Sequence, residues 1–153
     1  MSTATDSAGT PARRRVDQLL AHYEESHRNP RNERIHFVAI PLIMLSLVGL
    51  LHAAHPWAAY LFILASMVYY ARLSGVFLLS MAVLSVIALV LVRAMGDQVL
   101  PISIAIFVGA WIAQFIGHKI EGKKPSFFED LQYLWVGPLF VLSKLYGRLG
   151  IRW

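Results

Sequence analysis

Charged side chains are missing from three long stretches of this 153-residue chain. No Asp, Glu, Lys or Arg occurs at positions 35–71, 73–92 or 98–118. The composition is 57% hydrophobic and 15% charged, whereas soluble domains average roughly 45–50% and about 25%. Apolar residues gathered into uncharged blocks of this length are typical of membrane-spanning helices. We therefore expect an all-α integral membrane protein.

Short polar turns divide the uncharged stretches into four apolar blocks, so we predict four transmembrane helices. The expected spans are residues 36–51, 57–71, 74–92 and 99–118, joined by turns that include His52–Pro56 and Arg93–Gln98. Six Arg lie at positions 13–34 and six Lys or Arg follow residue 118, while those two turns carry one basic residue between them. The positive-inside rule then places both termini in the cytoplasm.

The segments outside the spans carry weaker patterns. Residues 1–12 are small and polar and are predicted to be a disordered tail, followed by a single membrane domain over 13–153. Residues 14–26 have the apolar spacing of an amphipathic helix that lies on the membrane or packs against the domain. A second interfacial helix is expected over about 126–147, opened by a capping box at Ser126 and Glu129 and interrupted at Gly137-Pro138, with an apolar end that is interfacial or re-entrant.

The net charge and the cysteine content limit which partners and which kinds of metal site the chain can have. The net charge of +5 comes from basic residues that flank the apolar blocks, where anionic headgroups attract them, so we expect a lipid bilayer and no nucleic acid as partner. Cysteine is absent, which excludes disulfides and thiolate metal sites. The oligomeric state is left open.

The predicted topology sorts the six histidines by side of the membrane. His22, His27 and His36 precede or begin the first span, and His118 ends the fourth span on the same side. His52 and His55 follow the first span, about 24 Å away across the bilayer. Four imidazoles can therefore converge and two cannot join them.

Polar side chains lie near this expected convergence. Gln114 precedes His118 by one helical turn and Glu121 follows it by three residues, so the three can share a helix face. Three imidazoles and a carboxylate suit a first-row transition metal such as Fe(II) or Zn(II). The alternative is that these histidines are interfacial or capping residues, and for Asn32 an N-cap of the first span is the favoured interpretation over a role at the site.

Two motifs carry a resemblance to a known family. They are Tyr23-x3-His27-x4-Asn32-x3-His36-x4-Pro41 and Trp111-x2-Gln114-x2-Gly117-His118-x2-Glu121-x3-Pro125, with Gly137-Pro138-Leu139-Phe140 downstream. Over about residues 18–146 the chain resembles the 2-hydroxy fatty acid dioxygenases, small membrane proteins long catalogued as a domain of unknown function. Their characterised eukaryotic member is a protein of the endoplasmic reticulum that acts in fatty acid α-oxidation during phytosphingosine breakdown. The resemblance implies that this chain lies in a bacterial inner membrane or, in a eukaryote, in the endoplasmic reticulum.

The resemblance implies an Fe(II)-dependent enzyme, with no 2-oxoglutarate co-substrate, that uses O2 to shorten a 2-hydroxy fatty acid by one carbon. It implies His27, His36 and His118 as the metal ligands, and His22 is kept as a candidate fourth. A 2-hydroxy acid can chelate iron through its carboxylate and hydroxyl, with its acyl chain among the spans.

The remaining candidate site residues have supporting roles. Lys119 or Lys123 could pair with the substrate carboxylate, and Glu121 or Gln114 could orient a ligand imidazole. Two other functions stay open at this point. One is a b-type haem protein with His36 and His118 as axial ligands, and the other is a membrane scaffold without enzymatic activity.

Overall fold

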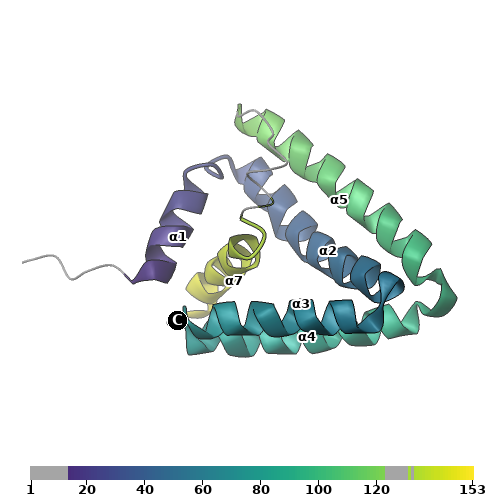
Figure 1. Cartoon of the computed structure of the whole chain (residues 1–153). Helices are drawn as coiled ribbons and strands as arrows, with labels where there is room; N and C mark the ends of the chain where they lie inside the picture. Colours follow the sequence, from purple (N-terminus) through teal and green to yellow (C-terminus); the bar gives the residue numbers. More distant parts are fainter. Residues whose placement is uncertain (1–13, 123–130, 132) are drawn as a thin grey trace, which may run out of the picture.

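The chain folds into helices that enclose a triangular space in projection (Figure 1). This computed structural model describes residues 14–122, 131 and 133–153, and all regular secondary structure in that part of the chain is helical. The helices are α1 (Arg15–Glu24), α2 (Pro30–Ala54), α3 (Pro56–Ala71), α4 (Gly75–Ala94), the short 3-10 helix η1 (Gly96–Gln98), α5 (Val99–Glu121) and α7 (Val136–Leu149). The predicted disordered tail, the capping box at Ser126 and Glu129, and Lys123 lie outside the described residues.

Helices α2 and α5 run side by side and form one edge of the triangle (Figure 1). The N-cap of α2 is Asn29, whose side-chain oxygen accepts a hydrogen bond from the Arg31 N–H at 2.9 Å. The prediction that Asn32 is the N-cap is therefore wrong. Pro30 can begin the helix because its missing N–H falls in the first turn. Asn32 and His36 lie inside the helix and are fully buried.

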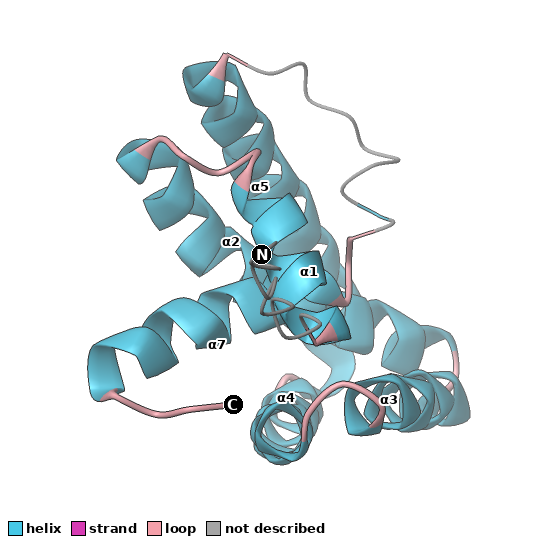
Figure 2. Cartoon of the chain, turned by 90° about the vertical axis from the view of Figure 1, so that its left-hand side faces the viewer, coloured by secondary structure: helices cyan, strands magenta, loops and turns pink. Residues whose placement is uncertain are grey.

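Helices α3 and α4 form the base of the triangle. Figure 2 views them nearly along their axes and shows them side by side. Three of the described helical segments are long and apolar enough to cross a membrane, namely Pro30–Ala54, Gly75–Ala94 and Gly96–Glu121. Helix α3 is equally apolar but has 16 residues, about 24 Å, against a hydrocarbon thickness of roughly 30 Å.

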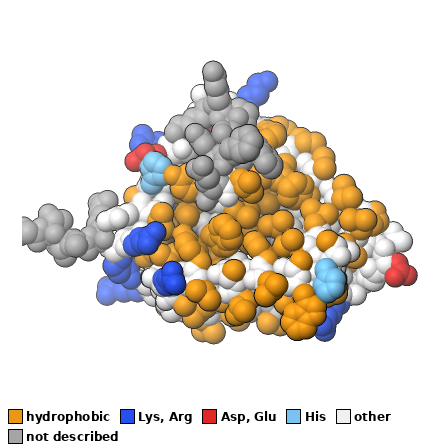
Figure 3. Space-filling view, in the orientation of Figure 1, with side chains coloured by type: hydrophobic (Ala, Val, Ile, Leu, Met, Phe, Trp, Pro, Cys, Tyr) orange, Lys and Arg blue, Asp and Glu red, His pale blue; other side chains and the backbone are white. Residues whose placement is uncertain are grey.

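The outer surface supports the membrane assignment. Large apolar side chains are exposed along α4, including Leu79, Val86 and Val90, each more than 60% exposed. Figure 3 shows that hydrophobic side chains cover most of one face, while Lys and Arg lie near its periphery. A face of this kind is stable in lipid and is a liability in water. The fold is thus an all-helical membrane protein.

Helix α7 fills the open end of the triangle between α1 and α4 (Figure 1). Seven consecutive residues of α7, Val136 through Leu142, are buried. They pack with Val16, Leu20 and Tyr23 of α1 in one apolar cluster. The apolar stripe of α1 therefore packs against the domain, which was one of its two predicted placements. Gly137 and Pro138 do not interrupt a helix as predicted, since α7 begins beside them and Pro138 falls in its first turn, where a proline costs no hydrogen bond.

Other boundaries differ from the predicted ones by a few residues. Helix α2 continues to Ala54, so the expected turn at His52–Pro56 shrinks to His55 alone. His55 caps α3, because its Nδ1 accepts a hydrogen bond from the Trp57 N–H at 3.3 Å. The turn at Arg93–Gln98 is largely the 3-10 helix η1.

Candidate metal centre

Three histidines from three different segments meet at one end of the α2–α5 pair. His27 lies between α1 and α2, His36 lies in the second turn of α2, and His118 lies in the last turn of α5. One ring nitrogen of each lies within 4.8 Å of the other two. All three side chains are buried, with 3%, 0% and 6% exposure respectively. The predicted convergence of these residues is present in the structure.

The imidazole rings stand nearly edge-on to one another. The ring centroids of His27 and His36 are 4.3 Å apart, those of His36 and His118 are 4.8 Å apart, and those of His27 and His118 are 5.5 Å apart. The interplanar angles lie between 63° and 78°. Rings in this arrangement can direct one nitrogen each toward a common point, as the ligands of a single ion must.

Backbone carbonyls fix the protonation of two of the rings. His27 Nδ1 lies 2.8 Å from the Tyr23 carbonyl oxygen, and His36 Nδ1 lies 3.0 Å from the Asn32 carbonyl oxygen. A carbonyl oxygen can only accept, so each Nδ1 carries a proton, and in the neutral imidazole the lone pair is then on Nε2. Histidine that binds a metal through Nε2 has this tautomer, with Nδ1–H held by a carbonyl or carboxylate. The donor set therefore fits a transition-metal ion.

Tyr23 and Phe140 enclose His27. The Tyr23 ring stacks on the His27 ring at a centroid distance of 4.2 Å and an interplanar angle of 9°. Phe140 of α7 contacts both, at 5.5 Å from His27 and 5.1 Å from Tyr23. Neither residue is predicted from the sequence to have a role at the site. The spacing of Tyr23 and His27, four residues apart, was the available signal, because a helical turn brings such side chains together.

Gly117 permits the close approach of α2 and α5 at the site. A Cβ atom at this position would lie 2.3 Å from Asn32 Oδ1 and 3.2 Å from His36 Cε1. Neither neighbour can retreat easily, since both side chains are fully buried. The absence of a side chain at Gly117 therefore leaves the space that Asn32 and the candidate ligand His36 occupy. Gly117 belongs to the second motif, but the motif alone predicts no function for it.

Glu121 ties the segment that carries His27 to the end of α5. Its carboxylate accepts hydrogen bonds from the backbone N–H groups of Arg28 at 3.0 Å and Asn29 at 2.8 Å, and from Asn32 Nδ2 at 3.1 Å. Asn32 Nδ2 also lies 3.3 Å from the Ser26 carbonyl oxygen. The backbone carbonyl oxygen of Asn32 accepts the hydrogen bond from His36 Nδ1. Glu121 therefore orders the backbone around two candidate ligands.

The other candidate residues lie outside the group of three histidines, in different surroundings. His22 is exposed on α1, with its Nδ1 3.7 Å from Glu25 and its ring near Tyr133, so it is not brought to the three histidines. Lys119 is exposed beside His118. Gln114 is buried, and with Tyr23 and Trp111 it lines a cavity of about 20 Å³, room for about one water molecule. His52 and His55 lie at the far end of α2, as predicted.

Comparison with known proteins agrees with this geometry. The sequence matches the 2-hydroxy-palmitic acid dioxygenase Mpo1-like family over residues 14–149. The chain belongs to this family. It is also similar to the 2-hydroxy-palmitic acid dioxygenase MPO1 of Saccharomyces cerevisiae, with 29% identity over 138 residues that cover 86% of this chain and 79% of the yeast protein. No solved structure matches the chain.

Membership of the Mpo1-like family covers every residue of the histidine group. The matched range includes α1, the three histidines, Glu121 and α7. The family resemblance inferred from the two motifs is thus confirmed, and it supports an oxidoreductase of the dioxygenase class.

Proposed function

We propose that this chain is an Fe(II)-dependent dioxygenase that uses O2, without 2-oxoglutarate, to shorten 2-hydroxy fatty acids by one carbon. The observation that carries the proposal is the buried group of His27, His36 and His118, with ligand atoms within 4.8 Å of one another, in a member of a dioxygenase family. The yeast relative is named for 2-hydroxy-palmitic acid, which supports the choice of substrate class.

The three histidines would hold the iron through one nitrogen each. When bound, Fe(II) would supply a Lewis acid for the substrate carboxylate and hydroxyl and a centre that activates O2. Three protein ligands leave room in the coordination sphere for such exogenous groups. The carbonyls of Tyr23 and Asn32 keep the imidazoles of His27 and His36 oriented.

Neighbouring residues would bind the polar end of the substrate and limit the access of water. Lys119 is adjacent to His118 and exposed, so it is placed to attract a carboxylate that approaches along the surface. Gln114 presents a buried amide to the small cavity beside Tyr23, where it can hydrogen bond a substrate oxygen. The aromatic rings of Tyr23 and Phe140 cover His27 and exclude water from that side.

The proposal includes a topology. Helix α3 serves as a short fourth span, both termini are cytoplasmic, and the histidine group lies at the cytoplasmic surface of a bacterial inner membrane or of the endoplasmic reticulum. The concentration of Lys and Arg near the two ends of the chain supports this orientation. Cysteines introduced at Ser2 and at Asp97, labelled by an impermeant reagent in sealed vesicles, should react from opposite sides.

Anaerobic reconstitution with Fe(II), followed by addition of O2 and 2-hydroxypalmitate, tests the activity directly. Mass spectrometry should detect a fatty acid one carbon shorter in the wild type and none in His36→Ala or in a reaction without O2. Consumption of O2 without a shortened acid, or product formation by His36→Ala, would contradict the proposal.

The haem and scaffold alternatives have distinct signatures. Axial ligation by two histidines requires a porphyrin between the imidazoles, whereas the His36 and His118 rings are 4.8 Å apart and His27 packs against both. A haem protein would show an intense visible spectrum after purification. A scaffold would show the same iron content in the wild type, His36→Ala and His118→Ala.

A further inference from the structure

A second cavity, of about 240 Å³, lies among α2, α3, α4 and α7. It occupies the wedge that forms because α2 and α3 meet at His55 and diverge from there, while α7 fills the wide end (Figure 1). An engineered apolar cavity of about 150 Å³ stays dry and takes up benzene. The cavity among these helices is larger than that.

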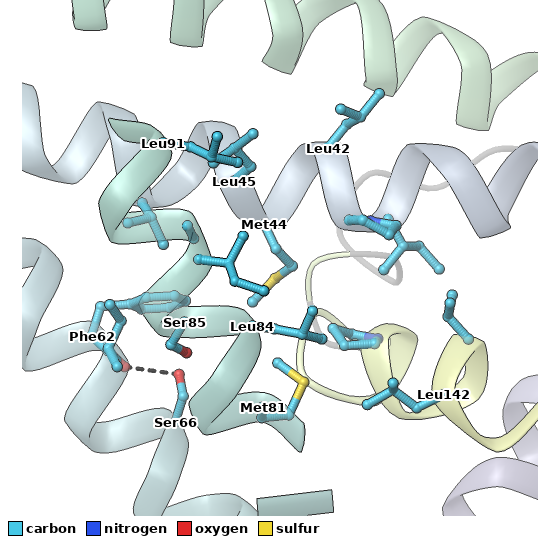
Figure 4. A pocket seen from close by; sticks show the side chains of 18 residues that line it. Leu42, Met44, Leu45, Phe62, Ser66, Met81, Leu84, Ser85, Leu91 and Leu142 are labelled. Carbon is cyan, nitrogen blue, oxygen red and sulfur yellow. Dashed lines mark hydrogen bonds between the residues drawn. The ribbon is translucent and has the colours of Figure 1, made fainter. Parts of the chain in front are cut away.

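The lining of this cavity is almost entirely apolar. Helix α2 contributes Pro41, Met44, Leu45 and Val48, and α4 contributes Met81, Leu84, Ser85, Ala88 and Leu91, so each helix presents positions three or four residues apart. Figure 4 shows Met44 and Leu84 extending into the space between the helices. The Ser66 hydroxyl donates to the Phe62 carbonyl at 2.8 Å and accepts from Trp135 Nε1 at 2.9 Å. Its polar atom is therefore already engaged within the protein.

The cavity begins one helical turn from the histidine group. Ile40 lines it and follows His36 by four residues on α2. Pro138 and Val141 line it from α7, the helix whose Phe140 contacts His27. Ile40 and Met44 also line the small cavity that holds the Gln114 amide. From Ile40 to Val48 the cavity follows α2 for about 12 Å away from the histidines.

We propose that this cavity binds the acyl chain of the 2-hydroxy fatty acid, with the carboxyl end at the histidines and the methyl end toward Val48 and Leu91. The inference rests on the proposed function. Exposed lining residues, among them Leu42, Leu84 and Ile87, connect the cavity to the apolar surface. In a bilayer that surface faces lipid, so the chain enters laterally from the membrane and never crosses water.

The closed end of the wedge then sets the preferred chain length. Phe62 of α3 and Leu91 of α4 line the cavity where α2 and α3 converge. A larger side chain at Ala88 would fill this end of the cavity, since Ala88 lies one turn before Leu91 on the same face of α4. Long acyl chains would then no longer fit in the cavity, whereas short acyl chains still would.

The first experiment compares Ala88→Phe with Val86→Phe, a matched control on the lipid-exposed side of the same helix. Turnover is measured across 2-hydroxy acids from 8 to 18 carbons. Ala88→Phe should lower kcat/KM for the long acids roughly tenfold or more relative to the short ones, mainly through KM, and Val86→Phe should not. Leu91→Ala should shift the preference toward longer acids. Equal effects of Ala88→Phe and Val86→Phe at every chain length would overturn the inference.

A second experiment does not depend on turnover. A 2-hydroxy fatty acid with a diazirine near its methyl end is photolysed with the whole protein in liposomes, and labelled residues are mapped by mass spectrometry. Labelling of the cavity-lining residues Met81, Ser85 and Ala88 of α4 and Val141 of α7, if excess 2-hydroxypalmitate competes it away and Ala88→Phe reduces it, supports the site. If the same protein forms no product, the proposed reaction fails and the acyl site stands.

Two results would overturn the acyl site while the reaction stands. One is product formation with labelling confined to lipid-facing positions such as Val86 and Val90. The other is labelling of the cavity by a photoreactive phosphatidylcholine that excess 2-hydroxypalmitate does not displace, which would assign the cavity to a bilayer lipid.

Discussion

The chain carries histidines at both ends of α2, and the two groups differ in burial and in what surrounds them. His36 is fully buried and meets His27 and His118 within 4.8 Å. At the other end of α2, His52 packs near Tyr60 and His55 is exposed and caps α3. One end is therefore built around side chains from three segments, and the other end uses the same residue type for local structure.

The difference arises from the elements that each end of α2 meets. The first end lies against the last turn of α5 and the segment after α1, both of which deliver an imidazole. The far end packs against the start of α3, the end of α4 and the start of α5, and neither the end of α4 nor the start of α5 carries a histidine. His36 is thus a candidate ligand because two other segments of the chain bring His27 and His118 to it. The residues next to a histidine in the sequence do not by themselves identify it as a ligand.

Removal of a candidate ligand should give the largest difference in iron binding between variants at the two ends of α2. His36→Ala or His118→Ala should abolish stoichiometric iron binding and lower activity by more than the about 10–100-fold typical of residues that only support a ligand. His55→Ala, the control from the far end, should bind iron as the wild type does. Iron content by mass spectrometry after anaerobic loading measures this, and normal iron in both site variants would contradict the metal centre.

Loss of the Glu121 carboxylate should weaken the site without removing a ligand. Glu121→Ala deletes the acceptor of three hydrogen bonds, from Arg28, Asn29 and Asn32, so the segment before His36 loses its anchor to α5. We expect iron affinity to fall about 10–100-fold. A competition titration with a chelator measures the change, with Glu25→Gln as the control, and an unchanged affinity would show that Glu121 has no positioning role.

Two glycines of α5 offer a matched pair. Gly117→Ala would place a methyl group 2.3 Å from Asn32 Oδ1, whereas Gly109 has open space around it. We expect Gly117→Ala to destabilise the protein by about 1–3 kcal/mol and to weaken iron binding. Gly109→Ala should be neutral or stabilising by up to about 1 kcal/mol, because alanine favours helix. Thermal unfolding in detergent compares them, and equal melting temperatures would argue against a close approach at Gly117.

The far end of α2 should show the smallest effect. His55→Ala removes the side chain that caps α3, and the loss of a cap costs about 0.5–2 kcal/mol. The melting temperature should therefore fall slightly while iron content and activity per folded molecule stay constant. Loss of iron in this variant would mean that the two ends of α2 are not independent.

The convergence of the histidines was predictable, because it depends only on which ends of apolar helices share a side of the membrane. Uncharged blocks mark those helices, and an α2–α5 pair must bring His36 near His118 if both helices cross. The N-cap was not predictable in the same way. Asn29 and Asn32 both precede an apolar run, and the choice depends on the pairing of Asn32 with Glu121, which lies 89 residues away.

The position of α7 was also beyond prediction from its pattern. Residues Val136–Leu142 are uncharged and almost all apolar, which is equally consistent with a re-entrant piece in lipid and with a helix buried by its neighbours. Its burial depends on the wedge between α2 and α3, and that wedge is set by the angle between these helices at His55. Crossing angles between helices depend on side-chain packing at the contact, so the hydropathy pattern does not predict them.

X-ray absorption at the iron edge of the Fe(II)-loaded protein would detect the histidine ligands themselves. We expect one iron per chain with about three imidazole ligands in the wild type and in His55→Ala, and no specifically bound iron in His36→Ala. An iron environment without imidazole scattering, or one that is identical in the wild type and in His36→Ala, would contradict it.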